Sequence, residues 1–282
     1  GMLTRSATSR ANQNGPELYG FRGNSQNLDL NRDFTKMDSE NARTFAKIFH
    51  ALNPDVFVDN HVSNGADYQY TLTYISSLRE RIAPSLRKLI YGTMLPQLTQ
   101  ALKKSKWDLF PYVESVKETP DSGIYQFNDL PRYAMGYASL FNVISFTVET
   151  HMLKPYEQRV MATLALMETF VAFTGKNAKE IQDLRKKTKQ AMASADRFPI
   201  KWKLDKTGFT EYTFKGFESG NKPSEVSGLS RLYYDRSKPF TKTIKVFDKF
   251  APEMSITKPK AYIIPQGWWK VIDRLLALEK EA

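Results

Sequence analysis

The chain has 282 residues, of which 41% are hydrophobic, and it carries a formal net charge of +11. This length and composition are enough for one large core, or for one core with a smaller appendage, and they exclude a chain that is disordered throughout. The absence of cysteine excludes disulfides, thiol nucleophiles and cysteine-bound metals. No stretch is long and apolar enough to be predicted as a membrane span.

The positive charge is scattered along the sequence. Its densest run, Arg185 to Lys189, falls in a stretch with helical spacing and is therefore predicted to be the solvated face of a helix. No nucleic-acid-binding signature accompanies the charge, so we expect no nucleic-acid partner. A basic protein that binds nucleic acid or a surface is the last-ranked hypothesis, and strongly salt-dependent binding to a polyanion would support it.

The first predicted elements in chain order are a loop, a helix and a strand. Residues up to about Gln26 are polar and rich in turn residues, which predicts a loop. Such long loops normally connect elements, so we expect that an element ahead of it is missing. Apolar residues at helical spacing then predict a helix from Asp38 to Asn53. Residues 56–58 follow as a short strand buried on both faces, which is typical of a parallel sheet.

Helices and a second strand alternate in the next part of the chain. A helix-like stretch covers 79–104, with breaks expected at Pro84 and Pro96. Residues 143–150 are predicted to be a second buried strand, followed by helices at 155–174 and 178–195. The apolar stripe predicted for the helix at 155–174 consists of Val160, Met161, Leu164, Met167 and Val171.

After Pro199 the pattern changes to strands separated by turn residues. These strands are expected at 210–218, 241–247 and 261–264, with a closing helix from 266 to 278. The sequence therefore predicts an α/β domain over residues 1–198, with a mixed, mostly parallel sheet flanked by helices. Residues 199–282 are predicted to be a small β-rich C-terminal appendage.

Two residues stand at the ends of the buried strands. His61 ends the first, in the sequence FVDNHVS, and Glu149 ends the second, in SFTVETH. Sites in open α/β sheets lie beyond the carboxyl ends of strands, so His61 is a candidate metal ligand, with a structural histidine as the alternative. A buried carboxylate must be paired, bound to metal or abnormally titrating, and for Glu149 a structural salt bridge is the alternative.

An asparagine and an arginine stand together in the loop NLDLNRDF. Asn31 offers a neutral donor beside the planar guanidinium of Arg32. This combination suits bidentate capture of a carboxylate, although an arginine held by Asp33 would serve structure equally well.

Taken together, these features over about Arg10 to Thr174 resemble the zinc carboxypeptidase family, the carboxypeptidase A-like metallopeptidases. The resemblance implies an incomplete form of the phosphorylase/hydrolase-like carboxypeptidase fold. It also implies that Asn31 and Arg32 grip the C-terminal carboxylate of a substrate, that His61 is the third zinc ligand and that Glu149 is the catalytic glutamate.

The resemblance suggests further site residues by their distance from these motifs. Arg10, in RANQNGP, is the candidate for the oxyanion-stabilising arginine, with Arg5 as its rival. Tyr125, in GIYQF, is the candidate for the substrate-contacting tyrosine. Arg132, in LPRYAMGY, is a further candidate for substrate binding. The rivals of Tyr125 are Tyr133 and Tyr137.

The sequence departs from the family at its first two zinc ligands, a histidine and a glutamate separated by two residues. None of the three histidines begins such a motif. We therefore expect an N-terminally truncated chain that binds zinc weakly or not at all, because catalytic zinc needs three protein ligands. Its complete form would be a zinc-dependent metallocarboxypeptidase. The alternative is a non-catalytic module, derived from that fold, that binds carboxylates or peptides.

The same resemblance bears on partners and location. Peptide or protein C-termini are the expected ligands, and a periplasmic or secreted location is implied by what is usual in the family. Loss of the first strands would expose a sheet edge and apolar surface, so we expect that a second copy of the chain covers them or that the fold is rearranged there.

Overall fold

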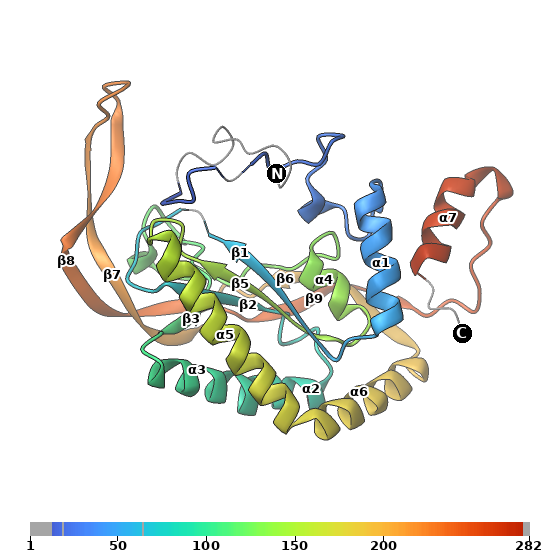
Figure 1. The fold of residues 1–282 in the computed structure, drawn as a ribbon. Helices are drawn as coiled ribbons and strands as arrows, with labels where there is room; N and C mark the ends of the chain where they lie inside the picture. The colour runs from blue at the N-terminus through green and yellow to red at the C-terminus, as the bar shows by residue number, and fades with distance from the viewer. Residues whose placement is uncertain (1–12, 19, 64, 279–282) are drawn as a thin grey trace.

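The computed structural model of the protein describes residues 13–18, 20–63 and 65–278 (Figure 1). At its centre is a four-stranded sheet with the strand order β1 (Val56–Val62), β5 (Ile144–Thr150), β2 (Leu72–Ser76), β3 (Leu109–Pro111). The pairs β1–β5 and β2–β3 are parallel, whereas β5–β2 is antiparallel. The predicted mixed α/β architecture is therefore confirmed.

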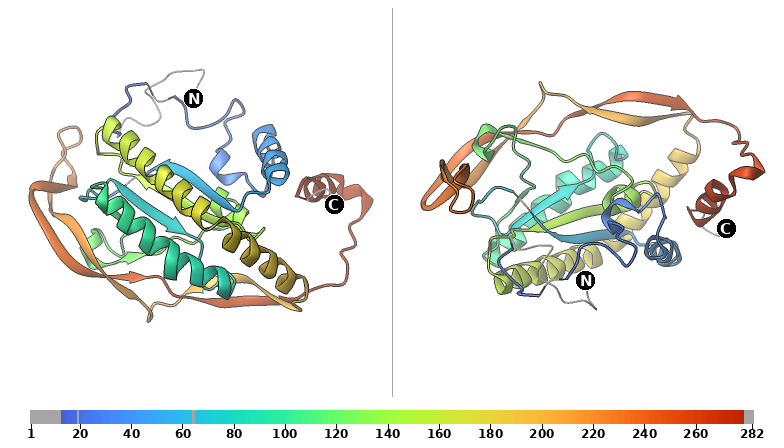
Figure 2. Two further views of the ribbon diagram at one scale, coloured as in Figure 1. Left: turned by 60° about the horizontal axis from the view of Figure 1, so that its bottom comes forward. Right: turned by 90° about the horizontal axis from the view of Figure 1, so that it is seen from above.

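Helices cover both faces of this sheet, as Figure 2 shows from two further sides. The helices of one face are α2 (Pro84–Leu89), the π-helical turn η2 (Ile90–Met94), α3 (Leu95–Lys104), α5 (Tyr156–Lys176) and α6 (Ala178–Ala193). The helices of the other face are α1 (Glu40–Leu52) and α4 (Ala134–Ser139). Because side chains alternate along a strand, Val56 and Val58 of β1 pack on the first layer and Phe57 packs on the second.

Local signals explain most helix boundaries. Ser39 caps α1 because its side chain accepts a hydrogen bond from the Ala42 N–H at 3.1 Å. The helix ends at Asn53, whose left-handed φ of 44° stops the α-helical pattern. Pro84 stands at the first position of α2, where a helix needs no N–H donor. The break predicted at Pro96 is wrong, because α2, η2 and α3 follow one another without interruption and Pro96 lies just after the π-helical turn.

The apolar stripe predicted for α5 is wrong. Val160, Met161, Leu164 and Val171 are exposed, and the helix instead buries the face that carries Leu166, Phe170 and Phe173. This helix has apolar residues on two sides, so spacing alone could not select the side that packs. The larger rings of Phe170 and Phe173 fill the space above the sheet, where Phe146 meets Phe170.

The expectation that the first strand is buried on both faces was wrong. β1 is half-buried along most of its length because it is an edge strand, and no described strand pairs with its outer edge. That a second copy covers this edge stays a prediction, which light scattering would test.

The solvated face predicted for the basic run of α6 is confirmed for its lysines, since Lys186, Lys187 and Lys189 are exposed. Arg185 differs because it is buried, where its Nε donates to the Asn142 carbonyl at 3.0 Å and its guanidinium pairs with Asp55.

The C-terminal part consists of two antiparallel pairs and a helix. These elements are β6 (Arg197–Leu204) with β9 (Phe250–Thr257), the long hairpin of β7 (Thr210–Pro223) with β8 (Ser230–Phe247), the 3₁₀ turn η4 (Gln266–Trp268) and α7 (Trp269–Leu278). The strand predicted at 261–264 is absent, and Tyr262 and Ile263 are exposed in a connection. β6 and β9 were missed because prolines interrupt both, which strands tolerate at edges and bulges.

The hairpin joins the α/β part through a second core. Phe214, Ile244 and Val246 of the hairpin are buried against Tyr70 and Phe110, and β8 also pairs with β4 (Ile124–Tyr125). The division into two domains at residue 199 stays a prediction. The second core contains residues from before and after this position. In the part of the chain that the structure describes, no helix has the length and apolarity needed to cross a membrane.

Candidate functional site

A cavity of about 220 Å³ lies at the carboxyl ends of β1 and β5, and His61 and Glu149 both line it. The two residues are direct partners in the parallel ladder of these strands. Directly paired residues have their side chains on the same face of a sheet, so both point to the side covered by α1 and α4. The structure therefore brings together the two residues that the sequence separates by almost ninety positions.

Asn31 and Arg32 line the same cavity from a short 3₁₀ turn, η1 (Leu30–Arg32). Asp29 caps this turn, since its carboxylate accepts from the Asn31 N–H at 3.0 Å. The Arg32 guanidinium lies 4.5 Å above the ring of Tyr133, and its Nη1 donates to the Asn31 carbonyl at 2.8 Å. Stacking and this hydrogen bond fix the orientation of the guanidinium at the cavity wall.

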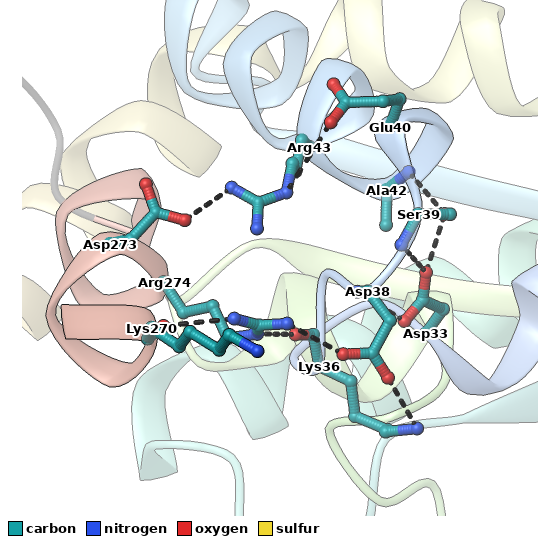
Figure 3. Close-up of polar contacts among 10 residues, drawn as sticks. All are labelled: Asp33, Lys36, Asp38, Ser39, Glu40, Ala42, Arg43, Lys270, Asp273 and Arg274. Atoms are coloured by element: carbon teal, nitrogen blue, oxygen red, sulfur yellow. Dashed lines mark hydrogen bonds and ion pairs between the residues drawn. The ribbon is translucent and has the colours of Figure 1, made fainter. Parts of the chain in front are cut away.

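Asp33 does not hold Arg32, which was the structural alternative for this loop. Its buried carboxylate accepts from the Asp38 N–H at 2.9 Å, and from the N–H and Oγ of Ser39 at 2.9 and 2.6 Å (Figure 3). The residue after Arg32 is thus fastened to the N-terminus of α1, and α1 itself packs on the sheet. The loop that carries Asn31 and Arg32 is built on a fixed element.

The C-terminal helix α7 contacts the same segment (Figure 3). Arg274 donates to the Lys36 carbonyl at 2.7 Å and to the Asp38 carboxylate at 2.9 Å. A second ion pair joins Arg43 of α1 to Asp273 of α7 at 2.7 Å. Two distant parts of the chain therefore meet beside the Asn31–Arg32 loop.

Arg22 is a cavity residue that the sequence reasoning missed. Its Nε and Nη2 donate to one oxygen of Asp29 at 3.1 and 3.0 Å. Burial alone would raise the pKa of Asp29, but the hydrogen bond and charge of Arg22, with the charge of Arg32, bring it below its ordinary value. The available signal was a basic residue in the same loop as Arg32, with an acid between the two.

The imidazole of His61 is held by a carboxylate in the cavity. Its Nε2 lies 2.6 Å from a carboxylate oxygen of Asp59, which is two residues earlier and therefore on the same face of β1. Burial lowers the pKa of His61, but the hydrogen bond and charge of Asp59, with the charge of Glu149, outweigh burial and raise it above its ordinary value. The lining thus combines two guanidinium groups and an imidazole with Glu149 and with Asp129, which is paired with Arg81.

The structure separates the other predicted residues from this cavity. Tyr125 lies in β4, where pairing with β8 turns its ring onto Phe247 at 5.6 Å, and it lines a different hollow. Arg132 is exposed and donates to the Tyr133 hydroxyl at 3.0 Å without lining the cavity. Of the rival tyrosines, Tyr137 is buried among aromatic rings, and Tyr133 lines the cavity. Arg5 and Arg10 lie outside the described residues.

The other two histidines have structural contacts. His50 places its Nε2 at 2.9 Å from the Tyr137 hydroxyl, in the aromatic layer between α1 and α4. His151 is buried, and its Nε2 lies 2.9 Å from Asp67, which also accepts from Arg236 of β8 at 2.6 Å. The three-residue contact of His151, Asp67 and Arg236 fastens the hairpin to the end of β5.

The described residues do not fit a catalytic zinc ion. No group of three histidine, cysteine, aspartate or glutamate side chains in that part of the chain is placed to hold a metal. At the cavity there is one imidazole, which is engaged by Asp59, whereas catalytic zinc sites use three protein ligands. What the arrangement offers chemically is anion binding next to a carboxylate.

Comparisons with known proteins add no relative to this picture. No family model, curated protein or solved structure matches the chain.

Proposed function

We propose that this cavity is the substrate site of a carboxypeptidase-type peptidase, which hydrolyses the C-terminal peptide bond of peptides or proteins. The observation that supports the proposal is the shared cavity of Asn31, Arg32, His61 and Glu149. An anion-binding pair and a carboxylate base on neighbouring elements are what attack next to a terminal carboxylate requires.

The terminal carboxylate of the peptide binds to Arg32 and Asn31. The stacked guanidinium presents a planar donor set, which matches the two oxygens of a carboxylate, and the Asn31 amide adds a neutral donor. The charge of Arg22, which lines the same cavity, increases the attraction for the anion. This anchoring restricts the reaction to the last peptide bond, because the neighbouring bond is the one held near Glu149.

Glu149 acts as the base of the reaction. It takes the proton from the attacking water and returns it to the leaving amine. Arg22 is the described guanidinium best placed for the carbonyl oxygen, a role that the resemblance gave to Arg10. Hydrolysis through zinc would depend on ligands beyond the described residues, since these place only one imidazole, that of His61, at the cavity.

Binding of peptides with free and amidated C-termini tests the proposal directly. We expect the free acid to bind at least about tenfold more tightly, and Arg32→Ala to remove this preference, because a charge-assisted hydrogen bond contributes roughly 1.5–3 kcal/mol. Arg197→Ala is the matched control, since Arg197 is exposed in β6 and does not line the cavity. Equal affinity for acid and amide would reject the proposal.

A second function, binding of peptide C-termini without catalysis, is favoured by one specific observation. His61 is engaged by Asp59, and no described group of three residues is placed to hold a metal. Zinc content and release of C-terminal amino acids discriminate the two functions. For the peptidase we expect Glu149→Gln to bind peptides nearly as well as the parent and to lose turnover. Turnover by this variant would reject Glu149 as the base.

A further inference from the structure

A second hollow of about 830 Å³ adjoins the cavity, and we propose that it binds the part of a peptide that precedes its C-terminal residue. This inference rests on the proposed function and adds a substrate class to it, which is extended peptides and not single amino acids or dipeptides. The hollow lies between the α/β part and the β7–β8 hairpin, and we refer to it as the hairpin groove.

The hairpin groove is a direct neighbour of the cavity. Tyr112 and Phe127 line both hollows, and they stand where the two meet. The segment after β1 also passes from one to the other, since Ser63 lines the cavity and Ala66 lines the groove. A ligand whose terminal carboxylate reaches Arg32 can therefore continue past Tyr112 into the groove.

The sizes of the two hollows point to a ligand that occupies both. Ligand sites typically measure roughly 300–1,000 Å³, so the cavity, at about 220 Å³, is large enough for only the end of a ligand. The groove, at about 830 Å³, falls within that range. A terminal residue in the cavity and several preceding residues in the groove would fill the combined space.

The lining of the groove suits a polypeptide. One wall carries the carboxylates of Glu114 and Glu118, and the facing hairpin carries Lys222 and Arg231. This balance gives neither the single-sign field that attracts nucleic acid nor the basic surface that attracts lipid head groups. Tyr233 contributes an amphipathic ring, the kind of side chain that dominates contacts with peptides.

The hairpin wall is held in place by an ion pair at the border of the groove. Arg236 of β8 donates to Asp67 at 2.6 Å, and Asp67, which itself lines the groove, is also in contact with buried His151. The Lys222 ammonium lies 5.4 Å from the centre of the Tyr233 ring, so these two lining residues contact each other within the hairpin. The wall is therefore formed before any ligand binds, which lowers the entropy lost on binding.

Calorimetric titration of the full chain with peptides of two and six residues tests the inference. The peptides share their last two residues, and a chelator prevents metal-dependent turnover. We expect the hexapeptide to bind roughly tenfold more tightly, because an aromatic contact adds affinity of that order. Tyr233→Ala should remove most of this gain and leave dipeptide affinity unchanged, whereas Tyr233→Phe should retain the gain. Tyr262→Ala, a tyrosine exposed outside the groove, is the matched control.

The outcomes separate this inference from the proposed function. Equal affinity for the two peptide lengths would reject peptide binding in the groove, and so would equal losses of affinity in Tyr233→Ala and Tyr262→Ala. Preference for the free acid would still support the carboxylate site in that case. A length effect without preference for the free acid would support the groove and reject the proposed function. Failure of both peptides to bind would reject both.

Discussion

The β7–β8 hairpin and the helix α7 both follow the α/β part in the sequence and lie at opposite ends of the molecule (Figure 1). Different kinds of interaction hold them to the α/β part. The hairpin is joined by buried rings and aliphatic side chains, with Phe214 1% exposed. Among the described residues, two ion pairs join α7 to α1 and to the segment before it, only Ala277 and Leu278 of α7 pack on the apolar layer of α1 and α4, and Trp268 and Trp269 remain outside. Burial of apolar surface should therefore fix the hairpin firmly, while α7 should respond to salt.

The largest effect is expected from the hairpin core. Phe214→Ala should lower the free energy of unfolding by about 3–5 kcal/mol, because it removes a buried ring and leaves a cavity. Chemical denaturation would measure the change. The control is Phe209→Ala, since Phe209 stands just before β7 and its side chain is exposed. Equal losses in the two variants would contradict a core shared by the hairpin and the α/β part.

An intermediate effect is expected from the polar contact between the hairpin and β5. Asp67→Asn should cost about 1–3 kcal/mol, because buried His151 loses its charged partner. Asp183→Asn, on the exposed face of α6, is a control that should change stability little. Unchanged unfolding of Asp67→Asn would show that the hairpin is held by its apolar core alone.

Acid should weaken the same contact. Burial lowers the pKa of His151 in spite of Asp67, so stability falls as the pH drops below the ordinary histidine value. Burial alone would raise the pKa of Asp67, but His151 and Arg236 hold it below its ordinary value. The stability that Asp67 contributes is therefore present above the ordinary aspartate value and is lost as the pH falls through the lowered one. In a pH series of unfolding curves, Asp67→Asn should lose the acid sensitivity near the ordinary aspartate value. It should keep or increase the part near the ordinary histidine value, because Asp67 opposes the lowering of the His151 pKa by burial.

The smallest effect is expected at α7. Arg274→Ala should change the free energy of unfolding by about 1 kcal/mol or less, because the ion pair with Asp38 is solvent-exposed. Hydrogen exchange should nevertheless quicken in α7, and added salt should produce the same quickening in the parent chain. A large loss of global stability would mean that α7 belongs to the core. Lys260→Ala, in the exposed connection, is the control.

The sequence was sufficient where one strong local pattern decides the outcome. Ser39 and Asn53 delimit α1, and the β-branched and aromatic residues of β5, which alternate with polar ones, predict a strand with Glu149 at its end. Placing His61 and Glu149 at strand ends also predicted that they would meet, because the ends of neighbouring parallel strands lie on one edge. The geometry of this pair follows from secondary structure alone.

Tertiary choices account for the misses. α5 has two apolar sides, and only the shape of the sheet decides that Phe170 faces inward while Val171 does not. Tyr125 lies at a suitable distance from Glu149 along the chain, but the pairing of β4 with β8 turns it away, whereas Tyr133 reaches the cavity through its contact with Arg32. Arg22 belongs to no sequence motif that marks it as a site residue. Its place in the cavity lining depends on how the N-terminal loop folds.

The pairing of His61 with Glu149 on one ladder makes ligand binding sensitive to strand alignment. Side chains alternate with a period of two, so a shift of β1 by one residue would send His61 toward α5 and leave Glu149 paired with Asn60 or Val62. Affinity for a peptide with a free terminal carboxylate would then serve as a reporter of correct folding. Such an assay would detect misaligned molecules that retain normal helix content.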